Sequence, residues 1–170
     1  MPCRVIAPFI YDQAIAYLMR RWKFDKQRGL ATIAAELALF SSNSCEVDQL
    51  ILPMPLHWRR QLERGFNQSK DLLDAMAKRH PFLFKHRPRT RDAPRLTRCR
   101  ATPKQSLATR EERQRNLAGA FHVRGDLAGR PVLVIDDVCT TGATAAAVTH
   151  ALHAAGAGPV TLWCVARTPR

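Results

Sequence analysis

Two adjacent carboxylates followed by a hydroxyl-rich turn carry the strongest chemical signal in this sequence. Asp136 and Asp137 come directly after four apolar residues, Val132–Ile135, and the loop Thr140–Thr144 reads Thr-Thr-Gly-Ala-Thr before an alanine-rich stretch. In open α/β sheets, ligands lie beyond the carboxyl ends of the strands. A helix N-terminus offers unpaired N–H groups and a partial positive charge to a phosphate. The pattern predicts a sugar-phosphate site on a turn from a buried strand into a helix.

The loop and the two acids would have separate tasks in such a site. Gly142 lets the backbone approach a phosphate, and the threonine hydroxyls add donors. Adjacent carboxylates would repel a phosphate, so we expect them to face ribose hydroxyls and a Mg²⁺ ion. The alternative is an ordinary turn with a threonine cap and solvated acids, but the full pattern favours a binding site. The candidate phosphate-binding residues are Thr140, Thr141, Gly142, Ala143 and Thr144, and the candidate catalytic residues are Asp136 and Asp137.

A cluster of arginines follows a second apolar segment. Leu50–Leu52 is a predicted strand that leads into Pro53-Met54-Pro55, whose prolines end regular structure. Arginine guanidinium groups match phosphate oxygens in bidentate fashion, which would suit a pyrophosphate. An ordinary basic loop in which Asn67 caps the next helix fits the composition equally well. The candidate pyrophosphate-binding residues are Arg59, Arg60 and Arg64.

Apolar strands that alternate with helices predict an α/β fold, with a parallel sheet flanked by helices on both faces. Residues 1–40 are expected to form a helical segment packed on the core, and residues 41–170 the main domain. The predicted helices are Tyr11–Phe24, Leu30–Phe40, Asn67–Arg79, Leu107–Leu117 and Ala143–Ala155. The predicted strands are Leu50–Leu52, Phe82–Phe84, Ala120–Val123, Val132–Ile135 and Val160–Val165.

The composition limits the class of protein and suggests anionic partners. The 170 residues contain no apolar run long enough to span a membrane and no signal peptide, so we expect a cytoplasmic protein. Five scattered cysteines without a CxxC pair indicate neither a metal site nor a disulfide framework. The net charge is +13, and eleven Lys and Arg against three acids between Lys85 and Arg115 contribute +8 of it. This excess favours polyanionic ligands.

Several motifs resemble known families. Val132–Thr144 resembles the fingerprint of the type I phosphoribosyltransferases, with four apolar residues, two acids, an apolar residue and a Thr-Thr-Gly-x-Thr loop. Pro53-Met54-Pro55-Leu56 followed by Glu63–Gln68 resembles the ComF family, and Trp163–Thr168 is similar to its GntX branch. ComF proteins usually carry a zinc ribbon before this domain, which the sequence lacks. The chain is then a fragment, has a misassigned start, or comes from a lineage without the ribbon.

The resemblance implies a ligand and a role for each motif. Asp136 and Asp137 would hold the 2′- and 3′-hydroxyls of 5-phosphoribosyl-1-pyrophosphate, and Thr140–Thr144 would hold its 5′-phosphate. The stretch Arg98–Arg115 would correspond to the mobile loop that covers the active site, although a solvated basic loop has the same composition. The loop cations that could neutralise the pyrophosphate are Arg98, Arg100 and Lys104.

Three functions follow as hypotheses. The first is a Mg²⁺-dependent phosphoribosyltransferase with an unknown nitrogen acceptor, and the second is a competence protein of DNA uptake that binds single-stranded DNA through its basic patch. The third is a sensor that binds the sugar pyrophosphate without turnover. A homodimer or a partner in the competence machinery would fit each of them.

Overall fold

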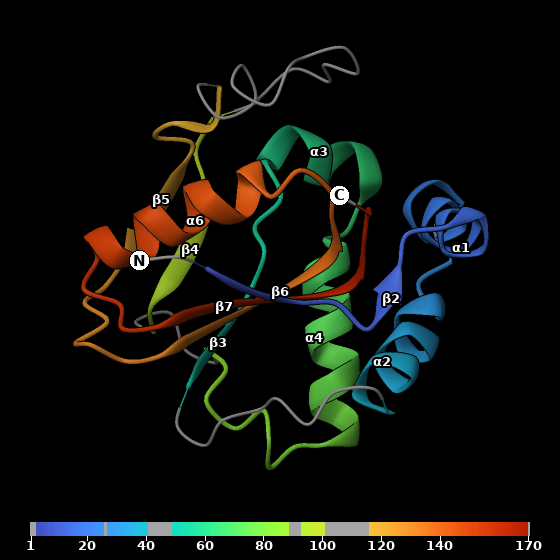
Figure 1. The fold of residues 1–170 in the computed structure, drawn as a ribbon, viewed down its shortest axis with the longest axis horizontal. Coiled ribbons are helices and arrows are strands. Elements are labelled where there is room, and N and C mark those ends of the chain that lie inside the picture. The colour runs from blue at the N-terminus through green and yellow to red at the C-terminus, as the bar shows by residue number, and fades with distance from the viewer. Residues whose placement is uncertain (1–2, 26, 41–48, 89–92, 101–115, 170) are drawn as a thin grey trace.

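The computed structural model describes residues 3–25, 27–40, 49–88, 93–100 and 116–169. Its centre is a parallel sheet in the order β1-β7-β6-β3, with β2 pairing beside β1 on the same strand β7 (Figure 1). The strands are β1 (Arg4–Ile6), β2 (Phe9–Ile10), β3 (Leu50–Pro53), β6 (Val132–Cys139) and β7 (Val160–Arg167). The predicted α/β class with a parallel sheet is confirmed.

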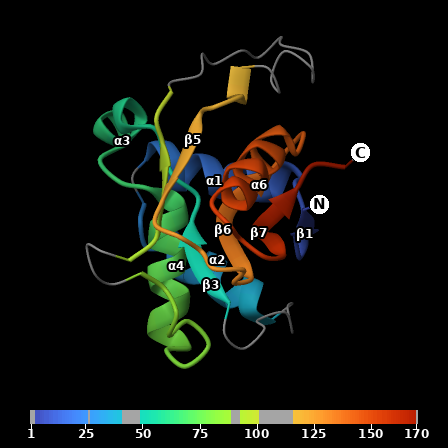
Figure 2. The ribbon, with the colours of Figure 1, turned by 90° about the vertical axis from the view of Figure 1, so that its left-hand side faces the viewer.

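Both faces of this sheet are buried, because successive side chains along each strand point to opposite sides. Val132 and Val134 pack in one apolar cluster, whereas Leu133 and Ile135 pack in the other. Helix α6 (Ala143–Ala154) covers the first face. Helices α1 (Gln13–Phe24), α2 (Leu30–Phe40) and α4 (Gln68–Arg79) lie on the second, as the turned view shows (Figure 2).

Three features differ from the sequence-based prediction, and a fourth prediction is not tested. A two-stranded antiparallel ribbon, β4 (Arg95–Arg98) and β5 (Phe121–Arg124), stands beside the main sheet, and only its second strand was predicted. The arginine cluster forms a short helix, α3 (Trp58–Arg64), instead of a loop. Phe82–Phe84 forms turns and not a strand. Most of the predicted helix Leu107–Leu117 lies outside the described residues.

The N-terminal segment contributes strands as well as helices. The predicted helices are present as α1 and α2, and they are preceded by β1 and β2, which the sequence pattern did not predict. Trp22 of α1 is fully buried among the residues that cover the second face of the sheet. The division of the chain at residue 40 stays a prediction. Across the described ranges, no helix is long and apolar enough to cross a membrane.

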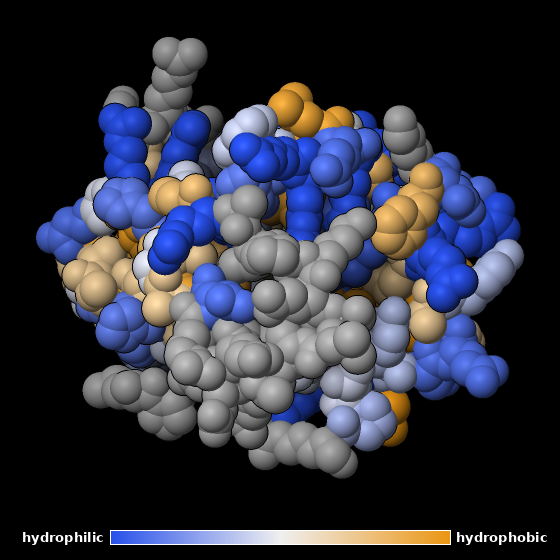
Figure 3. Space-filling view, turned by 90° about the horizontal axis from the view of Figure 1, so that it is seen from above, coloured by the Kyte–Doolittle hydropathy of each residue, from blue (hydrophilic) through white to orange (hydrophobic). Residues whose placement is uncertain are grey.

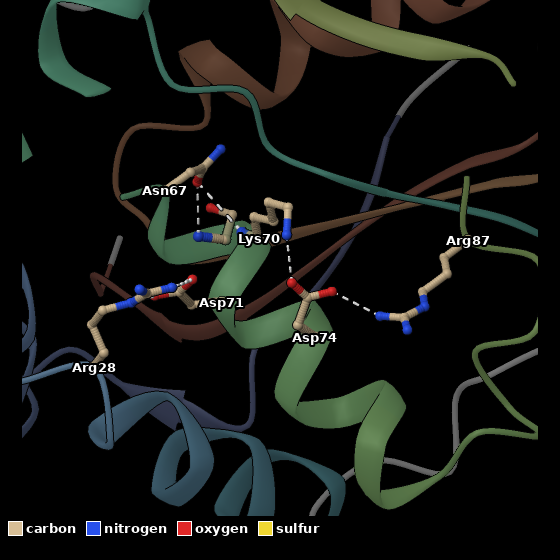
Figure 4. A network of polar contacts seen from close by, with 7 residues as sticks. Arg28, Asn67, Lys70, Asp71, Asp74 and Arg87 are labelled. Atoms are coloured by element: carbon tan, nitrogen blue, oxygen red, sulfur yellow. Dashed lines mark hydrogen bonds and ion pairs between the residues drawn. The ribbon is translucent and has the colours of Figure 1, made fainter. Parts of the chain in front are cut away.

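Polar contacts hold the first turns of helix α4 in place (Figure 4). Asn67 caps it, because its Oδ1 accepts from the backbone N–H groups of Ser69 at 3.0 Å and Lys70 at 3.4 Å. Arg28, which precedes α2, forms a bidentate pair with Asp71 at 2.7 and 2.8 Å. The pair Arg28–Asp71 thus ties the start of α4 to the N-terminal segment.

Candidate functional site at the carboxyl ends of β3 and β6

The two acids of the phosphate-site motif lie near the end of β6, and each is held by two donors. Asp136 Oδ1 accepts from the hydroxyl of Ser69 at 3.0 Å and from the N–H of Asp137 at 2.9 Å. Asp137 Oδ1 accepts from the N–H of Val138 at 2.7 Å, and its Oδ2 pairs with Lys23 Nζ at 2.5 Å. The carboxylates are therefore oriented before any ligand arrives.

Asp136 carries the most informative electrostatic feature of the site. Burial, and then the neighbouring charge of Asp137, raise the pKa of Asp136 to about 7. The hydrogen bonds from Asp137 N–H and Ser69 and the charge of Lys23 oppose this rise. A carboxyl group that gains a proton near neutral pH is typical of functional sites, although ion-pair networks also produce such shifts.

The loop Thr140–Thr144 leads into the N-terminus of α6 as predicted. Gly142 has φ 76°, a left-handed conformation that favours glycine, and it begins the helix without a side-chain cap. Thr141 Oγ1 lies 3.4 Å from the N–H of Ala143. The loop is anchored on its other side by Thr168, which donates through its hydroxyl to the carbonyl of Thr140 at 3.1 Å. The first turn of α6 therefore presents N–H groups of the kind that bind anions.

The arginine cluster and the carboxylate pair lie at the ends of adjacent strands. The N–H of Met54, just after β3, donates to the carbonyl of Ile135 at 2.8 Å. Asn67 Nδ2 donates to the carbonyl of Met54 at 3.0 Å and so ties the start of α4 to the same point. Helix α3 lies between these two anchors and ends at Gly65, with φ 79°. The end of β3, α3 and the start of α4 thus form a second wall next to β6.

Three of the predicted cations share one electrostatic environment. Burial lowers the pKa of Arg64, which the charge of Asp137 opposes and that of Arg60 reinforces. Burial likewise lowers the pKa of Arg98, with the charge of Arg60 lowering it further and that of Asp136 raising it. Arg64 and Arg98 therefore lie within electrostatic reach of the carboxylate pair, and Arg60 lies within reach of both arginines. This end of the molecule exposes many strongly hydrophilic side chains (Figure 3).

The other predicted cations differ in their placement. Arg59 is exposed and stacks on Trp58, with its guanidinium carbon 5.3 Å from the ring centroid. Arg100 donates to the carbonyl of Ala118 at 3.2 Å. Lys104 lies outside the described residues. Arg59 thus contacts Trp58 and Arg100 contacts Ala118, and neither belongs to the group formed by Arg60, Arg64 and Arg98.

Two residues that orient the carboxylates were not identified from the sequence. Ser69 lies in the first turn of α4, directly after the motif Glu63–Gln68, so its position next to the motif was an available signal. Lys23 is at the end of α1, far from Asp137 in the sequence. No local pattern links it to the site. Only the packing of α1 against the sheet brings the two side chains together.

Comparison with known proteins defines the family. No family model matches the chain. It is 30% identical to the DNA utilization protein YhgH of Escherichia coli O157:H7 over 97% of the chain and 72% of that protein. The chain belongs to the ComF family. This ComF-family chain is also 28% identical to competence protein F of Haemophilus influenzae, over 92% of the chain and 69% of that protein. It is 30% identical to competence protein ComFC of Streptococcus pneumoniae, over 95% and 67%.

Proposed function

We propose that this protein binds 5-phosphoribosyl-1-pyrophosphate and transfers its phosphoribosyl group to a nitrogen acceptor. The observation that supports this most strongly is the fixed pair Asp136 and Asp137 next to the open N-terminus of α6. The helix N-terminus suits the 5′-phosphate. The carboxylates, held by donors on one side, suit the ribose hydroxyls on the other.

The second wall supplies the positive charge that a pyrophosphate needs. Arg60 and Arg64 of α3 and Arg98 of β4 would bind the leaving group while the bond from C1 of the ribose to the pyrophosphate oxygen breaks. The incoming nitrogen forms the new bond at C1 and loses its proton to solvent or to a basic group. Positioning and charge neutralisation then provide the rate enhancement.

The donor set of the site is compatible with Mg²⁺ bound mainly through the ligand. The described residues hold no group of three or more His, Cys, Asp or Glu side chains that could bind a metal on their own. Mg²⁺ commonly uses one or two carboxylates together with substrate phosphates. Asp136 and Asp137 are the carboxylates that could hold it, and the ion would neutralise charge on the pyrophosphate.

Release of pyrophosphate from the labelled ligand, measured with Mg²⁺ over a panel of nitrogenous bases, tests turnover. The wild type should release pyrophosphate with at least one base, and Asp136→Asn combined with Asp137→Asn should abolish release. Tight binding without release over the whole panel would contradict transfer. That result would instead support a protein that senses the ligand.

A role in DNA uptake or utilisation is the biological context that we propose. It is supported by the names of the relatives, a DNA utilization protein and two competence proteins. The net charge of +13 is compatible with a direct contact to single-stranded DNA. Within the basic patch Lys85–Arg115, Arg95 is exposed, whereas Arg87 pairs with Asp74 at 2.7 Å (Figure 4).

The direct DNA contact is tested by fluorescence anisotropy with a single-stranded oligonucleotide at several salt concentrations. Replacing Arg87, Arg89, Arg91 and Arg95 by Ala should weaken binding and flatten its salt dependence, because fewer counterions are then released. Arg20→Ala on α1 is the control for the loss of a single exposed charge. Unchanged affinity and salt dependence in the quadruple variant would exclude this patch as the DNA contact.

A further inference from the structure

The carboxyl end of α1 contacts both sides of the proposed ligand site. One side is the end of β6, and the other is the second wall, formed by the end of β3, α3 and the start of α4. Lys23, in the last turn of α1, pairs with Asp137 at the end of β6. The next residue, Phe24, lies under the guanidinium group of Arg64, whose carbon is 5.6 Å from the ring centroid. Two consecutive residues of α1 therefore contact the two sides of the site, Lys23 at β6 and Phe24 at α3.

The Lys23–Asp137 pair differs from the surface ion pairs of the protein. Its side chains are 22% and 13% exposed. In the ion pairs Arg28–Asp71 and Lys70–Asp74, by contrast, the basic side chain is 63% and 64% exposed. Exposed pairs are screened by solvent and contribute little, whereas a sheltered pair holds its partners in a defined geometry.

The two carboxylates are supported in parallel ways. Each accepts from one backbone N–H and from one side chain, which is Ser69 for Asp136 and Lys23 for Asp137. Both oxygens of Asp137 are thereby fixed, since Oδ1 faces Val138 N–H and Oδ2 faces the ammonium group. The cation also offsets the repulsion between the two adjacent acids.

From this arrangement we propose that Lys23 is a positioning residue of the ligand site, which holds Asp137 in the orientation that accepts a ribose hydroxyl. The inference rests on the proposed function, because it assigns a ribose-binding role to Asp137. Lys23 acts on the ligand through Asp137. Helix α1 is then a structural part of the ligand site and not only a helix that packs beside it.

Isothermal titration calorimetry with ribose 5-phosphate as the probe, arranged as a double-mutant cycle, tests this inference. Lys23→Met should weaken binding by about tenfold in the wild-type background. In the Asp137→Asn background the same change should alter the affinity by less than about twofold, because the group that Lys23 orients is already lost. Lys23→Arg, which keeps the charge, should retain affinity to within about threefold.

Arg20→Met is the matched control, because Arg20 lies exposed on the same helix. Its affinity should equal that of the wild type. If Lys23→Met does not fold, as judged by circular dichroism, Lys23→Gln takes its place in the cycle. An unchanged affinity, or an equal loss in both backgrounds, overturns the positioning role. Absence of binding by the wild-type protein would instead contradict the proposed function.

Discussion

At the scale of single residues, the stability of the protein depends on the protonation state of the Asp136 carboxyl group. Its pKa is raised to about 7, whereas an aspartate in the unfolded chain ionises near 3.8. Between these two values the folded protein binds more protons than the unfolded chain. The free energy of unfolding therefore decreases as the pH rises from about 4 to about 7, and this contribution is constant above that range.

This linkage gives a prediction for the variant Asp136→Asn. The neutral amide removes the cost of a buried charge beside Asp137, so the variant should be more stable than the wild type at pH 8, by ~1–4 kcal/mol. The difference should shrink towards pH 5, where Asp136 in the wild type is protonated. Urea unfolding at the two pH values measures it, with the exposed Glu63→Gln as the control. Parallel pH dependences in Asp136→Asn and the wild type would show that Asp136 is not the group responsible.

Some residues of the candidate site could be recognised from the sequence, and others could not. The carboxylate pair was recognisable, because its residue types follow an apolar strand and precede a glycine-containing turn. Lys23 was not recognisable, because the ion pair depends on where α1 packs. Arg59, in contrast, is part of the predicted cluster but stacks on its neighbour Trp58. Spacing identifies candidates, and packing decides which of them face the site.

At the scale of elements, the turn into α6 depends on the backbone of Gly142. A Cβ at this position would meet no atom within 4 Å, so the cost of a substitution arises from its φ of +76° alone. Gly142→Ala should destabilise the protein by about 1 kcal/mol and should weaken binding of ribose 5-phosphate severalfold, because the loop relaxes away from the phosphate geometry. Calorimetry and thermal unfolding measure the two effects.

Gly29→Ala provides the control for that change. A Cβ at Gly29 also meets nothing within 4 Å, and its φ is outside the left-handed range. Its stability and ligand affinity should therefore match those of the wild type. Equal effects of the two substitutions would indicate that the conformation of Gly142 has no special part in the phosphate site.

Helix α3 would contact a different part of the proposed ligand. Arg64 is held by Gln68 at 3.0 Å and lies within reach of the charge of Asp137. In the proposed site its guanidinium group would meet the pyrophosphate. Arg64→Met should weaken binding of the full ribosyl pyrophosphate by at least about tenfold, since a charge-assisted hydrogen bond is lost. Binding of ribose 5-phosphate should change by less than about twofold. A similar loss for both probes would place Arg64 elsewhere in the site.

The elements themselves were predictable where a long apolar pattern marked them. β6, β7 and α6 combine apolar runs with glycine or threonine at their ends, and each appears near its predicted range. β1 and β2 have only three and two residues, too few to show a period. β4 lies in a proline- and arginine-rich stretch and is stabilised by its pairing with β5, which a local pattern does not reveal. Tertiary pairing therefore created the strands that the sequence did not predict.

At the scale of the whole molecule, three segments far apart in the sequence meet at one end of a parallel sheet. The N-terminal helix α1 brings Lys23, and the segment after β3 brings the arginines of α3. Strand β6 and helix α6 bring the carboxylates and the loop Thr140–Thr144. This agrees with the general rule that ligands bind beyond the carboxyl ends of parallel strands. The net charge of +13 favours the approach of an anionic ligand to this end.

Calorimetric titration with 5-phosphoribosyl-1-pyrophosphate and Mg²⁺ tests the central claim most directly. The wild-type protein should bind the ligand with measurable heat, and pyrophosphate or ribose 5-phosphate should compete for the site. Asp136→Asn combined with Asp137→Asn should remove the heat while the protein stays folded, because the acceptors for the ribose hydroxyls are lost. Absence of any heat or competition with the wild type at millimolar ligand would contradict the assignment of this site.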